Sequence, residues 1–350
     1  MRRGWKTPRF WAPDASVPVD RPFTRREALA NGVSPGLLAR LMRDGLIVSP
    51  LRGALHAAGL PDGLELRIAC AKLVVTPDAV ITDRTAGWLH FAPMVLAPGD
   101  HQRIPNVDIF RPPGNRIRRA SVRSGERTLQ DQEIVEMDGL RVTTKLRTTC
   151  DLGMGLPRRP AFAGMCAMMK VADFTPGDIR FQADTRFRGH RWVTQLRGLA
   201  SLARPEFQSP GECTLALIWT DEATLPPFVS QFEVRGPHCP CYLDLAVPEL
   251  LYAAEYDGVS WHGPAQAAHD DERREYLRKE GGWIIDVFHE EDVSGPMPVA
   301  GELLRAGIVR ARQRLGQLAW SGQDRSRDAL PSAGSTPYVV IQSPGQRPWA

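Results

Sequence analysis

The chain has no apolar run that approaches the length of a membrane span. Its basic N-terminus, Met1-Arg-Arg-Gly-Trp-Lys, is not followed by the apolar stretch of a secretory signal. These absences predict a cytoplasmic protein with no membrane partner. Cysteine is scarce and irregularly spaced, which favours reduced thiols over a disulfide framework. The six cysteines are Cys70, Cys150, Cys166, Cys213, Cys239 and Cys241.

Several sequence motifs of common enzyme classes are also missing. There is no phosphate loop, no glycine-rich dinucleotide fingerprint and no nucleophile elbow. The segment His238-Cys239-Pro240-Cys241 resembles half of a zinc site, but no second pair of ligands lies at a suitable spacing. What remains is a chain of 350 residues with 24% charged and 43% hydrophobic residues, typical of a globular protein of two or three domains.

The net charge is only +4, but the arginines are clustered. Such clusters suit the phosphates of nucleic acids through electrostatics and bidentate hydrogen bonds. The alternatives are solvated loops, or surfaces that neutralise an acidic protein partner. The first cluster contains Arg103, Arg111, Arg116, Arg118, Arg119, Arg123 and Arg127, and the second contains Arg186, Arg188, Arg191, Arg197 and Arg204.

Residues 21–60 predict a winged helix-turn-helix. Thr24-Arg-Arg-Glu27 is a capping box that opens a short helix, and Ser34-Pro35 starts a second helix. A hairpin with Arg52-Gly53 at its tip follows, which completes the order helix, turn, helix, wing. The alternative is a small helical cap that binds nothing. The residues expected to contact DNA are Arg40, Arg43 and Arg52.

The rest of the chain predicts an α+β protein. Residues 61–180 contain short strand and helix candidates and form a small α+β middle domain, and residues 181–318 form a C-terminal α/β domain. A basic helix is expected from Asp178 to about Ala203. The segments 1–20 and 319–350 are rich in Pro, Gly, Ser and charged residues, so we expect a flexible N-terminus and a disordered tail.

Acidic residues are concentrated in the run from Tyr242 to Gly258. We expect Cys241–Val247 and Leu250–Asp257 to be antiparallel strands joined at Pro248-Glu249, so that Asp244 faces Ala253. Side chains alternate across a strand, which puts three carboxylates on one side of the sheet. Crowded carboxylates repel one another, and Mg²⁺ removes that cost. The alternative is an exposed hairpin with solvated acids. The three carboxylates are Asp244, Glu255 and Asp257.

Several motifs follow one another in the C-terminal part, and together they resemble the PD-(D/E)xK nuclease domain of the very-short-patch-repair endonuclease-like group. The resemblance covers about 85 residues and implies a restriction-endonuclease-like α/β fold that hydrolyses DNA with Mg²⁺ or Mn²⁺. The motifs are Ser209-Pro-Gly-Glu212, Gln231-Phe-Glu-Val, Leu243-Asp-Leu-Ala-Val-Pro, Ala254-Glu-Tyr-Asp-Gly258, His262, Asp271-Glu-Arg-Arg-Glu275 and Gly282-Trp-Ile-Ile-Asp-Val-Phe288.

The resemblance implies a role for each matching position. Asp244 and Glu255 would be the metal ligands, while Asp257 stands where the family pattern has a lysine. His262 is the expected replacement for that lysine, as general base or acid. Glu212 either helps to position metal or water, or only caps its helix. The basic side of the following helix is expected to face a phosphate, or else to pair with Glu275 and Asp270. It carries Arg273 and Arg274.

The N-terminal part is similar to AbiEi-type abortive-infection antitoxins. This similarity is carried by Phe23-Thr-Arg-Arg-Glu-Ala-Leu-Ala-Asn-Gly-Val-Ser34, by Arg52-Gly53 and by Val142-Thr-Thr-Lys-Leu-Arg-Thr-Thr-Cys-Asp-Leu152. It implies double-stranded DNA and a cognate toxin or defence protein as partners. The leading hypothesis is therefore a metal-dependent DNA endonuclease in defence, toxin–antitoxin function or repair. The alternative is a non-catalytic winged-helix repressor or antitoxin with a degenerate nuclease fold.

Overall fold

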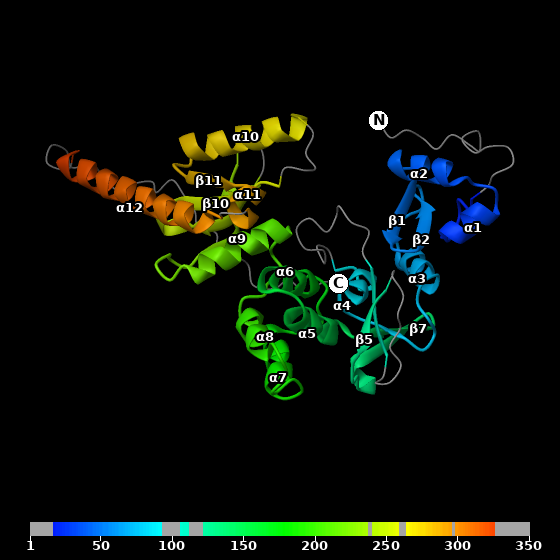
Figure 1. Cartoon of the computed structure of the whole chain (residues 1–350). Coiled ribbons are helices and arrows are strands. Elements are labelled where there is room, and N and C mark those ends of the chain that lie inside the picture. The colour runs from blue at the N-terminus through cyan, green and yellow to red at the C-terminus, as the bar shows by residue number, and fades with distance from the viewer. Residues whose placement is uncertain are drawn as a thin grey trace.

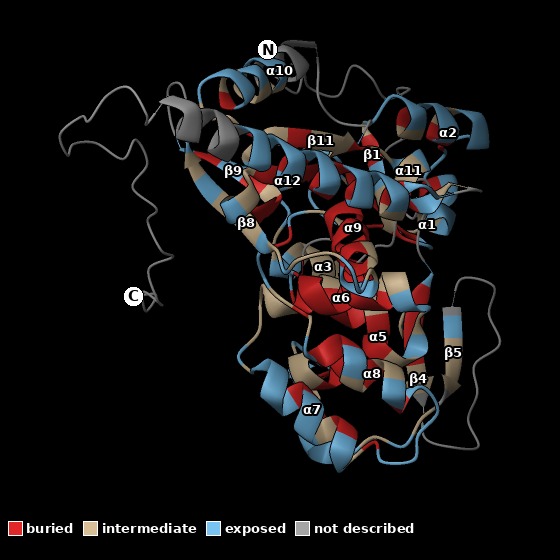
Figure 2. Cartoon of the chain, turned by 90° about the vertical axis from the view of Figure 1, so that its left-hand side faces the viewer, coloured by how far each residue is buried: buried red, intermediate tan, exposed pale blue. Residues whose placement is uncertain are grey.

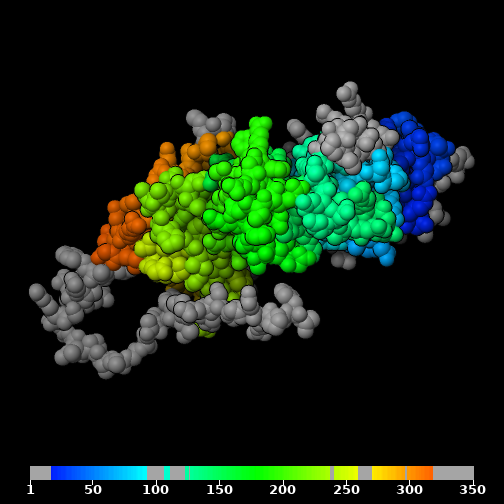
Figure 3. All heavy atoms as spheres, turned by 90° about the horizontal axis from the view of Figure 1, so that it is seen from below, coloured from blue at the N-terminus to red at the C-terminus, as the bar shows by residue number. Residues whose placement is uncertain are grey.

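The structure is a computed structural model that describes residues 17–92, 106–111, 122–236, 240–258, 264–295 and 298–325. It is a mixed α+β protein with several sheets. The molecule is elongated, with the N-terminal elements at one end and the long C-terminal helix α12 at the other (Figures 1 and 3). Helices α2 and α10 lie along one side of it, and α7 and α8 lie along the opposite side (Figure 1).

The N-terminal unit consists of two short helices and a hairpin, as predicted. The Thr24 hydroxyl accepts a hydrogen bond from the Glu27 amide at 3.1 Å, and the Ser34 hydroxyl accepts one from the Leu37 amide at 3.2 Å. Both predicted helix starts are therefore confirmed. The hairpin turns at Gly53, whose φ of 104° favours glycine. The elements are α1 (Arg25–Ala30), α2 (Pro35–Arg43), β1 (Ile47–Leu51) and β2 (Ala54–Ala57).

The middle of the chain forms a five-stranded mixed sheet in the order β5-β4-β3-β7-β6. Its tightest turn lies between β6 and β7, where Asp138 and Gly139 have φ values of 47° and 77°, as an Asp-Gly hairpin requires. The apolar faces of these strands pack with helices α3 and α4 into one core cluster. The elements are α3 (Leu64–Lys72), β3 (Val80–Ile81), α4 (Asp83–Leu89), β4 (Val107–Arg111), β5 (Val122–Glu126), η2 (Asp131–Glu133), β6 (Ile134–Met137) and β7 (Leu140–Thr143).

Four helices follow this sheet, and they correct one prediction. The single basic helix expected from Asp178 to Ala203 is two helices, because the chain reverses at Gly189 and Trp192, whose φ values are 79° and 67°. The reversal lets Ile179 and Leu196 enter the same core, which a straight helix would prevent. The helices are α5 (Lys145–Gly155), α6 (Arg158–Met169), α7 (Pro176–Asp184) and α8 (Val193–Ala200).

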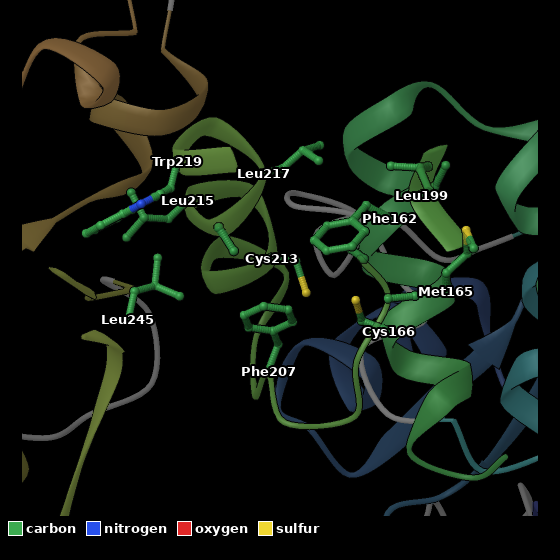
Figure 4. Packing of buried hydrophobic residues seen from close by; sticks show 14 of the residues in the cluster. Phe162, Met165, Cys166, Leu199, Phe207, Cys213, Leu215, Leu217, Trp219 and Leu245 are labelled. Carbon is green, nitrogen blue, oxygen red and sulfur yellow. The ribbon is translucent and has the colours of Figure 1, made fainter. Parts of the chain in front are cut away.

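Helix α6 joins the middle of the chain to the C-terminal part through a shared core. Phe162 of α6 packs edge-on against Phe207, with ring centroids 5.9 Å apart, and Cys166 lies near Cys213 (Figure 4). The same cluster continues to Leu245 in the C-terminal sheet. The domain boundary predicted at residue 181 falls inside α7, and the buried central helices α6 and α9 are visible in Figure 2.

The C-terminal part is a four-stranded sheet in the order β11-β10-β9-β8, with helices on both faces. Leu304 and Ile308 of α12 join the core on the α9 side, while Leu277 of α10 packs on the other side with Leu243. The predicted order helix, strand, strand, strand, helix, strand is confirmed. The elements are α9 (Pro210–Asp221), β8 (Val229–Arg235), β9 (Pro240–Val247), η3 (Pro248–Leu250), β10 (Tyr252–Tyr256), α10 (Pro264–Lys279), β11 (Ile284–Phe288), α11 (Glu290–Ser294) and α12 (Ala300–Arg325).

The described part of the chain extends into both segments that were predicted to be flexible. Val17 is buried in the N-terminal core, and α12 continues to Arg325, beyond the predicted domain end at residue 318. Residues 1–16 and 326–350 lie outside the described part of the chain. Among the helices that the structure describes, none has the length and apolar character needed to cross a bilayer.

Candidate functional site: an acidic site at the end of strands β9 and β10

The two acidic strands pair antiparallel, but not in the predicted register. Val247 faces Tyr252 and Leu245 faces Ala254, because the turn uses the 3-10 turn η3 and Leu251, whose φ is 49°. The predicted two-residue turn is therefore wrong, and the observed register differs from the predicted one by two residues. An even shift keeps each side chain on its face. Continued by one step, the observed register brings Asp244 opposite Glu255 rather than opposite Ala253.

The ladder between the two strands ends at Asp244, where the side chain replaces the backbone acceptor. The Tyr256 amide donates to Asp244 Oδ2 at 2.9 Å. Strand β9 also changes faces here, since Leu243 belongs to the core under α10 and Leu245 to the core under α9. Simple alternation fails at this position, and the carboxylate of Asp244 is turned toward the start of α9.

Gln231 connects Asp244 with Glu212. Its φ of 49° breaks the β8–β9 ladder, and its Nε2 donates to Asp244 Oδ1 at 3.0 Å and to Glu212 Oε2 at 3.2 Å. Burial raises the pKa of Asp244 well above its ordinary value, and the charges of Glu212 and Glu255 raise it further. Burial likewise raises the pKa of Glu212. The negative charges of the two carboxylates are thus held close together by one amide.

Glu212 has the capping contacts that were considered for it, and its part in positioning metal or water stays a prediction. Its amide donates to Ser209 Oγ at 3.1 Å, and its Oε2 accepts from the Gln208 amide at 2.8 Å, so it stabilises the start of α9. The same carboxylate faces Asp244 through Gln231. The close approach depends on Gly211, because a Cβ there would lie 1.9 Å from the ring of Tyr256.

Glu255 is nearly inaccessible and is contacted by two arginines of α10. Its Oε2 accepts from Arg273 Nη2 at 2.9 Å and from Arg274 Nε at 2.8 Å. Its Oε1 is buried and has no hydrogen-bond partner among the described residues. Arg274 Nη2 also donates to Asp257 Oδ2 at 3.0 Å. Neither arginine pairs with Glu275 or Asp270, so that alternative is wrong.

A cation fits this site only in part. Over the described residues, no group of three or more His, Cys, Asp or Glu side chains is arranged to hold a metal ion. The expected convergence of three carboxylates is therefore corrected, because Asp257 turns to Arg274. The orphaned Oε1 of Glu255 and the neighbouring Asp244 remain suitable oxygen ligands for Mg²⁺ or Mn²⁺, with water completing the coordination.

Two histidines are candidates for the predicted general base. His262 lies outside the described residues. His289, which the sequence analysis missed, follows β11 directly, and its Nδ1 lies 3.1 Å from the Asp257 carbonyl oxygen. It lines a surface hollow of about 530 Å³ together with Glu290 and Glu291. The available signal was the segment His289-Glu-Glu-Asp292 after the last strand, which reads as a helix start.

The arginines predicted to contact DNA in the N-terminal unit are exposed. Arg40 and Arg43 lie on α2, and the Arg40 side chain is 73% exposed with its Nε 3.6 Å from Asp44. Arg52 is exposed at the hairpin turn and donates to Asn106 Oδ1 at 3.2 Å. Their positions agree with the predicted face of the second helix and the wing tip.

A second group of buried carboxylates lies in the middle of the chain. Some of the clustered arginines pair with it. Arg127 Nη1 lies 3.2 Å from Asp83 and 2.7 Å from Asp151, and Arg123 Nε donates to Asp108 at 2.7 Å. Arg123 and Arg127 therefore have carboxylate partners within the chain, and contact of the clusters with phosphate stays a prediction. Four members of the clusters are bound internally to carboxylates: Arg123, Arg127, Arg186 and Arg197.

Arg147 extends this group toward Glu133. Its Nε donates to Asp151 at 3.0 Å, and its Nη1 lies 2.5 Å from Glu133 Oε2. Burial raises the pKa of Asp108 to about 6 and that of Asp151 to about 6, and the charge of Asp83 adds to both shifts. Each carboxylate here has at least one guanidinium partner, unlike Asp244.

Comparison with known proteins finds two distant relatives. No protein-family profile matches the chain. Two proteins of Mycobacterium tuberculosis are each 26% identical to it over 178 residues, which covers 50% of this chain and 65% of each relative. The chain thus spans less than two thirds of their length. They are uncharacterized protein MT2308 of strain CDC 1551 / Oshkosh and uncharacterized protein Rv2248 of strain ATCC 25618 / H37Rv.

Proposed function

We propose that the protein is a metal-dependent DNA endonuclease that hydrolyses phosphodiester bonds. The observation that carries the proposal is the pair Asp244 and Glu255, at the point where the backbone ladder between β9 and β10 ends. One of the two has a raised pKa, and the other has a buried oxygen without a described partner. A buried acid with a strongly raised pKa, and a buried carboxylate oxygen without a partner, are both typical of sites that bind or react.

The residues have distinct roles in this proposal. Asp244 and Glu255 would hold the ion, which lowers the pKa of a bound water and polarises the phosphate. Glu212, whose pKa is raised by burial, accepts a proton near neutral pH more readily than an ordinary glutamate does. Gln231 keeps Glu212 and Asp244 at a fixed separation, because it donates to both.

The N-terminal unit is proposed to bind double-stranded DNA. Arg40 and Arg43 are exposed on α2, and Arg52 is exposed at the hairpin turn, which suits contact with phosphates along a groove. Helix α2 lies on the same side of the molecule as α10, the helix that contacts the acidic site (Figure 1). This placement supports one DNA partner for both ends of the chain.

The test is cleavage of supercoiled and mismatched DNA in a titration with Mg²⁺ or Mn²⁺. We expect nicking by the full chain and its loss in Asp244→Ala and in Glu255→Gln. The matched control is Glu275→Gln, which removes a carboxylate of α10 that pairs with Lys279, away from the site. Nicking that persists in both site variants at the rate of the control would come from elsewhere and would refute the proposal.

A second candidate function is a non-catalytic DNA-binding repressor or antitoxin. The observation that favours it is the guanidinium of Arg274, which joins Glu255 to Asp257 where the resembled pattern has a lysine. A cognate toxin or defence protein would then be a partner, as the N-terminal resemblance implies. Salt-dependent DNA binding that is retained in Asp244→Ala, without cleavage by the unchanged protein, would favour this second function.

A further inference from the structure

A basic and aromatic segment, which we call the α7–α8 turn, connects α7 to α8. Its sequence is Arg186-Phe-Arg-Gly-His-Arg-Trp192, in which arginines alternate with rings. Phe187 anchors the turn, because its side chain is buried in the core and the His190 ring stands edge-on to it, with centroids 5.5 Å apart. The His190 amide donates to the Phe187 carbonyl oxygen at 2.9 Å, and the Val193 amide donates to the His190 carbonyl oxygen at 3.2 Å. The α7–α8 turn is therefore a fixed part of the fold.

Trp192 has a strained backbone conformation in this turn. Its φ of 67° places a bulky residue in the left-handed region, which glycine and asparagine adopt more easily. The residue is 54% exposed, and although it stands directly before α8, its side chain makes no capping hydrogen bond. Neither full burial nor capping accounts for a tryptophan in this conformation. Such strained residues cluster at functional positions.

Two exposed arginines lie next to this ring in the turn. Among the residues that the structure describes, no carboxylate forms an ion pair with Arg188 or Arg191. The Arg191 guanidinium lies over the Trp192 ring, with its carbon 5.0 Å from the ring centroid. By contrast, Arg186 and Arg197 nearby are held by carboxylates. The unpaired positive charge of the α7–α8 turn therefore accompanies its exposed ring.

Positive charge beside an exposed ring matches the chemistry of a single-stranded nucleic acid. Arginine binds phosphate through its charge and through bidentate hydrogen bonds, and an indole ring stacks with an unpaired base. A duplex hides the faces of its bases, and an acidic peptide supplies negative charge but no base to stack on the ring. The charge and the ring together, rather than the charge alone, therefore favour a single strand.

We propose that the α7–α8 turn binds single-stranded DNA, with one base stacked on Trp192 and the adjacent phosphates held by Arg188 and Arg191. Helices α7 and α8 lie on the side of the molecule opposite α2 and α10 (Figure 1), so this surface is neither the acidic site nor the N-terminal unit. The inference therefore goes beyond the proposed function. Only the choice of DNA over RNA rests on that function.

The test is fluorescence anisotropy of a labelled oligothymidylate of about 12 nucleotides, titrated with the full chain in the presence of a chelator that prevents cleavage. Trp192→Gly removes the ring and suits the left-handed backbone, and it should weaken binding at least about fivefold. Trp192→Phe keeps an aromatic ring and should retain most of the affinity.

The arginines are tested by the salt dependence of the same binding. In the double variant Arg188→Gln/Arg191→Gln, the slope of the logarithm of affinity against that of salt should fall by about 1.4, since each phosphate contact to a single strand contributes about 0.7. Arg312→Gln, which removes an exposed arginine of α12, is the control and should leave the slope as it is.

Circular dichroism establishes that each variant is folded, and Trp192→Asn replaces Trp192→Gly if the glycine variant does not fold. An abasic strand of the same length should bind the unchanged protein and Trp192→Gly equally, because it has no base to stack. Equal affinity of these two proteins for oligothymidylate would overturn the inference. Tighter binding of oligouridylate would assign the turn to RNA, and tighter binding of a polyglutamate peptide of equal charge would assign it to an acidic protein; either result would also overturn it.

The inference and the proposed function fail separately. A protein that binds oligothymidylate through Trp192 but cleaves no DNA would refute the proposed function and leave the inference intact. Cleavage of DNA, together with unchanged oligothymidylate affinity in Trp192→Gly, would refute the inference alone.

Discussion

The chain contains two groups of buried carboxylates, and they differ in how their charges are paired. In the middle of the chain, Asp83, Asp108 and Asp151 are each paired with arginine. At the C-terminal sheet, Asp244 and Glu212 share the amide of Gln231 instead, and Oε1 of Glu255 has no described partner. Both groups are shielded from water, so burial alone does not distinguish a structural charge from a functional one.

The difference is whether the fold satisfies the charges by itself. A buried carboxylate with a guanidinium partner completes a network, and removing the partner destabilises the protein. A buried carboxylate beside another carboxylate is destabilised by charge repulsion that the fold does not offset. This is common at sites that bind a ligand. The first group therefore predicts effects on stability, and the second predicts effects on activity.

The largest expected effect is the loss of cleavage in Asp244→Asn. The rate should fall on the order of 10⁴-fold, as for other groups on which a reaction depends. The free energy of unfolding at pH 8 should be unchanged or higher, because a carboxylate crowded by Glu212 and Glu255 has been neutralised. Plasmid nicking and urea unfolding measure the two quantities. A variant that is both active and less stable would reverse the assignment of the site.

The second effect is the destabilisation caused by Arg147→Ala. This side chain is 5% exposed and joins Glu133 to Asp151, so its removal leaves two buried carboxylates short of a partner. The free energy of unfolding should fall by about 3–5 kcal/mol. Arg158→Ala is the control, because Arg158 pairs with Asp221 at an exposed position. Equal losses in urea unfolding for the two variants would contradict the internal network.

A smaller effect is the pH dependence of stability that comes from Asp108. Its pKa of about 6 lies above the ordinary 3.8, chiefly because of burial. Its stabilising contribution is therefore complete below pH 3.8 and is lost as the pH rises through 6. Asp108→Asn should reduce the decline in unfolding free energy between pH 4.5 and 7.5 by about 2 kcal/mol. Asp138→Asn, at an exposed position, should leave the decline as it is.

Gly211→Ala tests the contact that brings α9 to the acidic strands. The new Cβ would lie 1.9 Å from the Tyr256 ring, so the helix start and β10 must separate. The expected loss is about 1–3 kcal/mol of stability, together with slower cleavage. Gly36→Ala is the control, since nothing lies within 4 Å of a Cβ there. Unchanged melting temperature and unchanged cleavage would show that the close approach is dispensable.

The smallest effect on stability is expected for Arg40→Ala combined with Arg43→Ala. Both side chains are exposed on α2, so the free energy of unfolding should change by less than about 0.5 kcal/mol. DNA affinity should fall, and the slope of its logarithm against salt should decrease by about one for each lost phosphate contact. Fluorescence anisotropy at several salt concentrations measures this. An unchanged slope would remove α2 from the DNA surface.

The sequence predicted the local elements well where caps and apolar periods are strong. Thr24, Ser34 and Ser209 start helices as expected. It failed where a backbone conformation depends on tertiary contacts. The left-handed conformations of Gln231 and Leu251, in residues that rarely adopt them, changed the register and broke the alternation at Asp244. No local pattern marks either residue.

The sequence also failed to predict which carboxylates pair with the arginines. The pairs Arg127–Asp83 and Arg274–Glu255 join residues that are 44 and 19 positions apart in the chain. Spacing along a helix predicts only partners three or four residues away, so Arg273 and Arg274 were assigned to phosphate or to local acids. The even register error alone would have kept Asp244 and Glu255 on one face, but the change of face in β9 at Asp244 turns its carboxylate toward α9.

The Gln231 amide lets the acidic site assemble as the chain folds. Nε2 of Gln231 donates to Asp244 and Glu212 while its Oε1 accepts from Gln208, so these two carboxylates are held in place without a bound ion. If the proposed function is right, a chelator should therefore abolish DNA cleavage without unfolding the protein. Adding the ion back should restore cleavage without a refolding step.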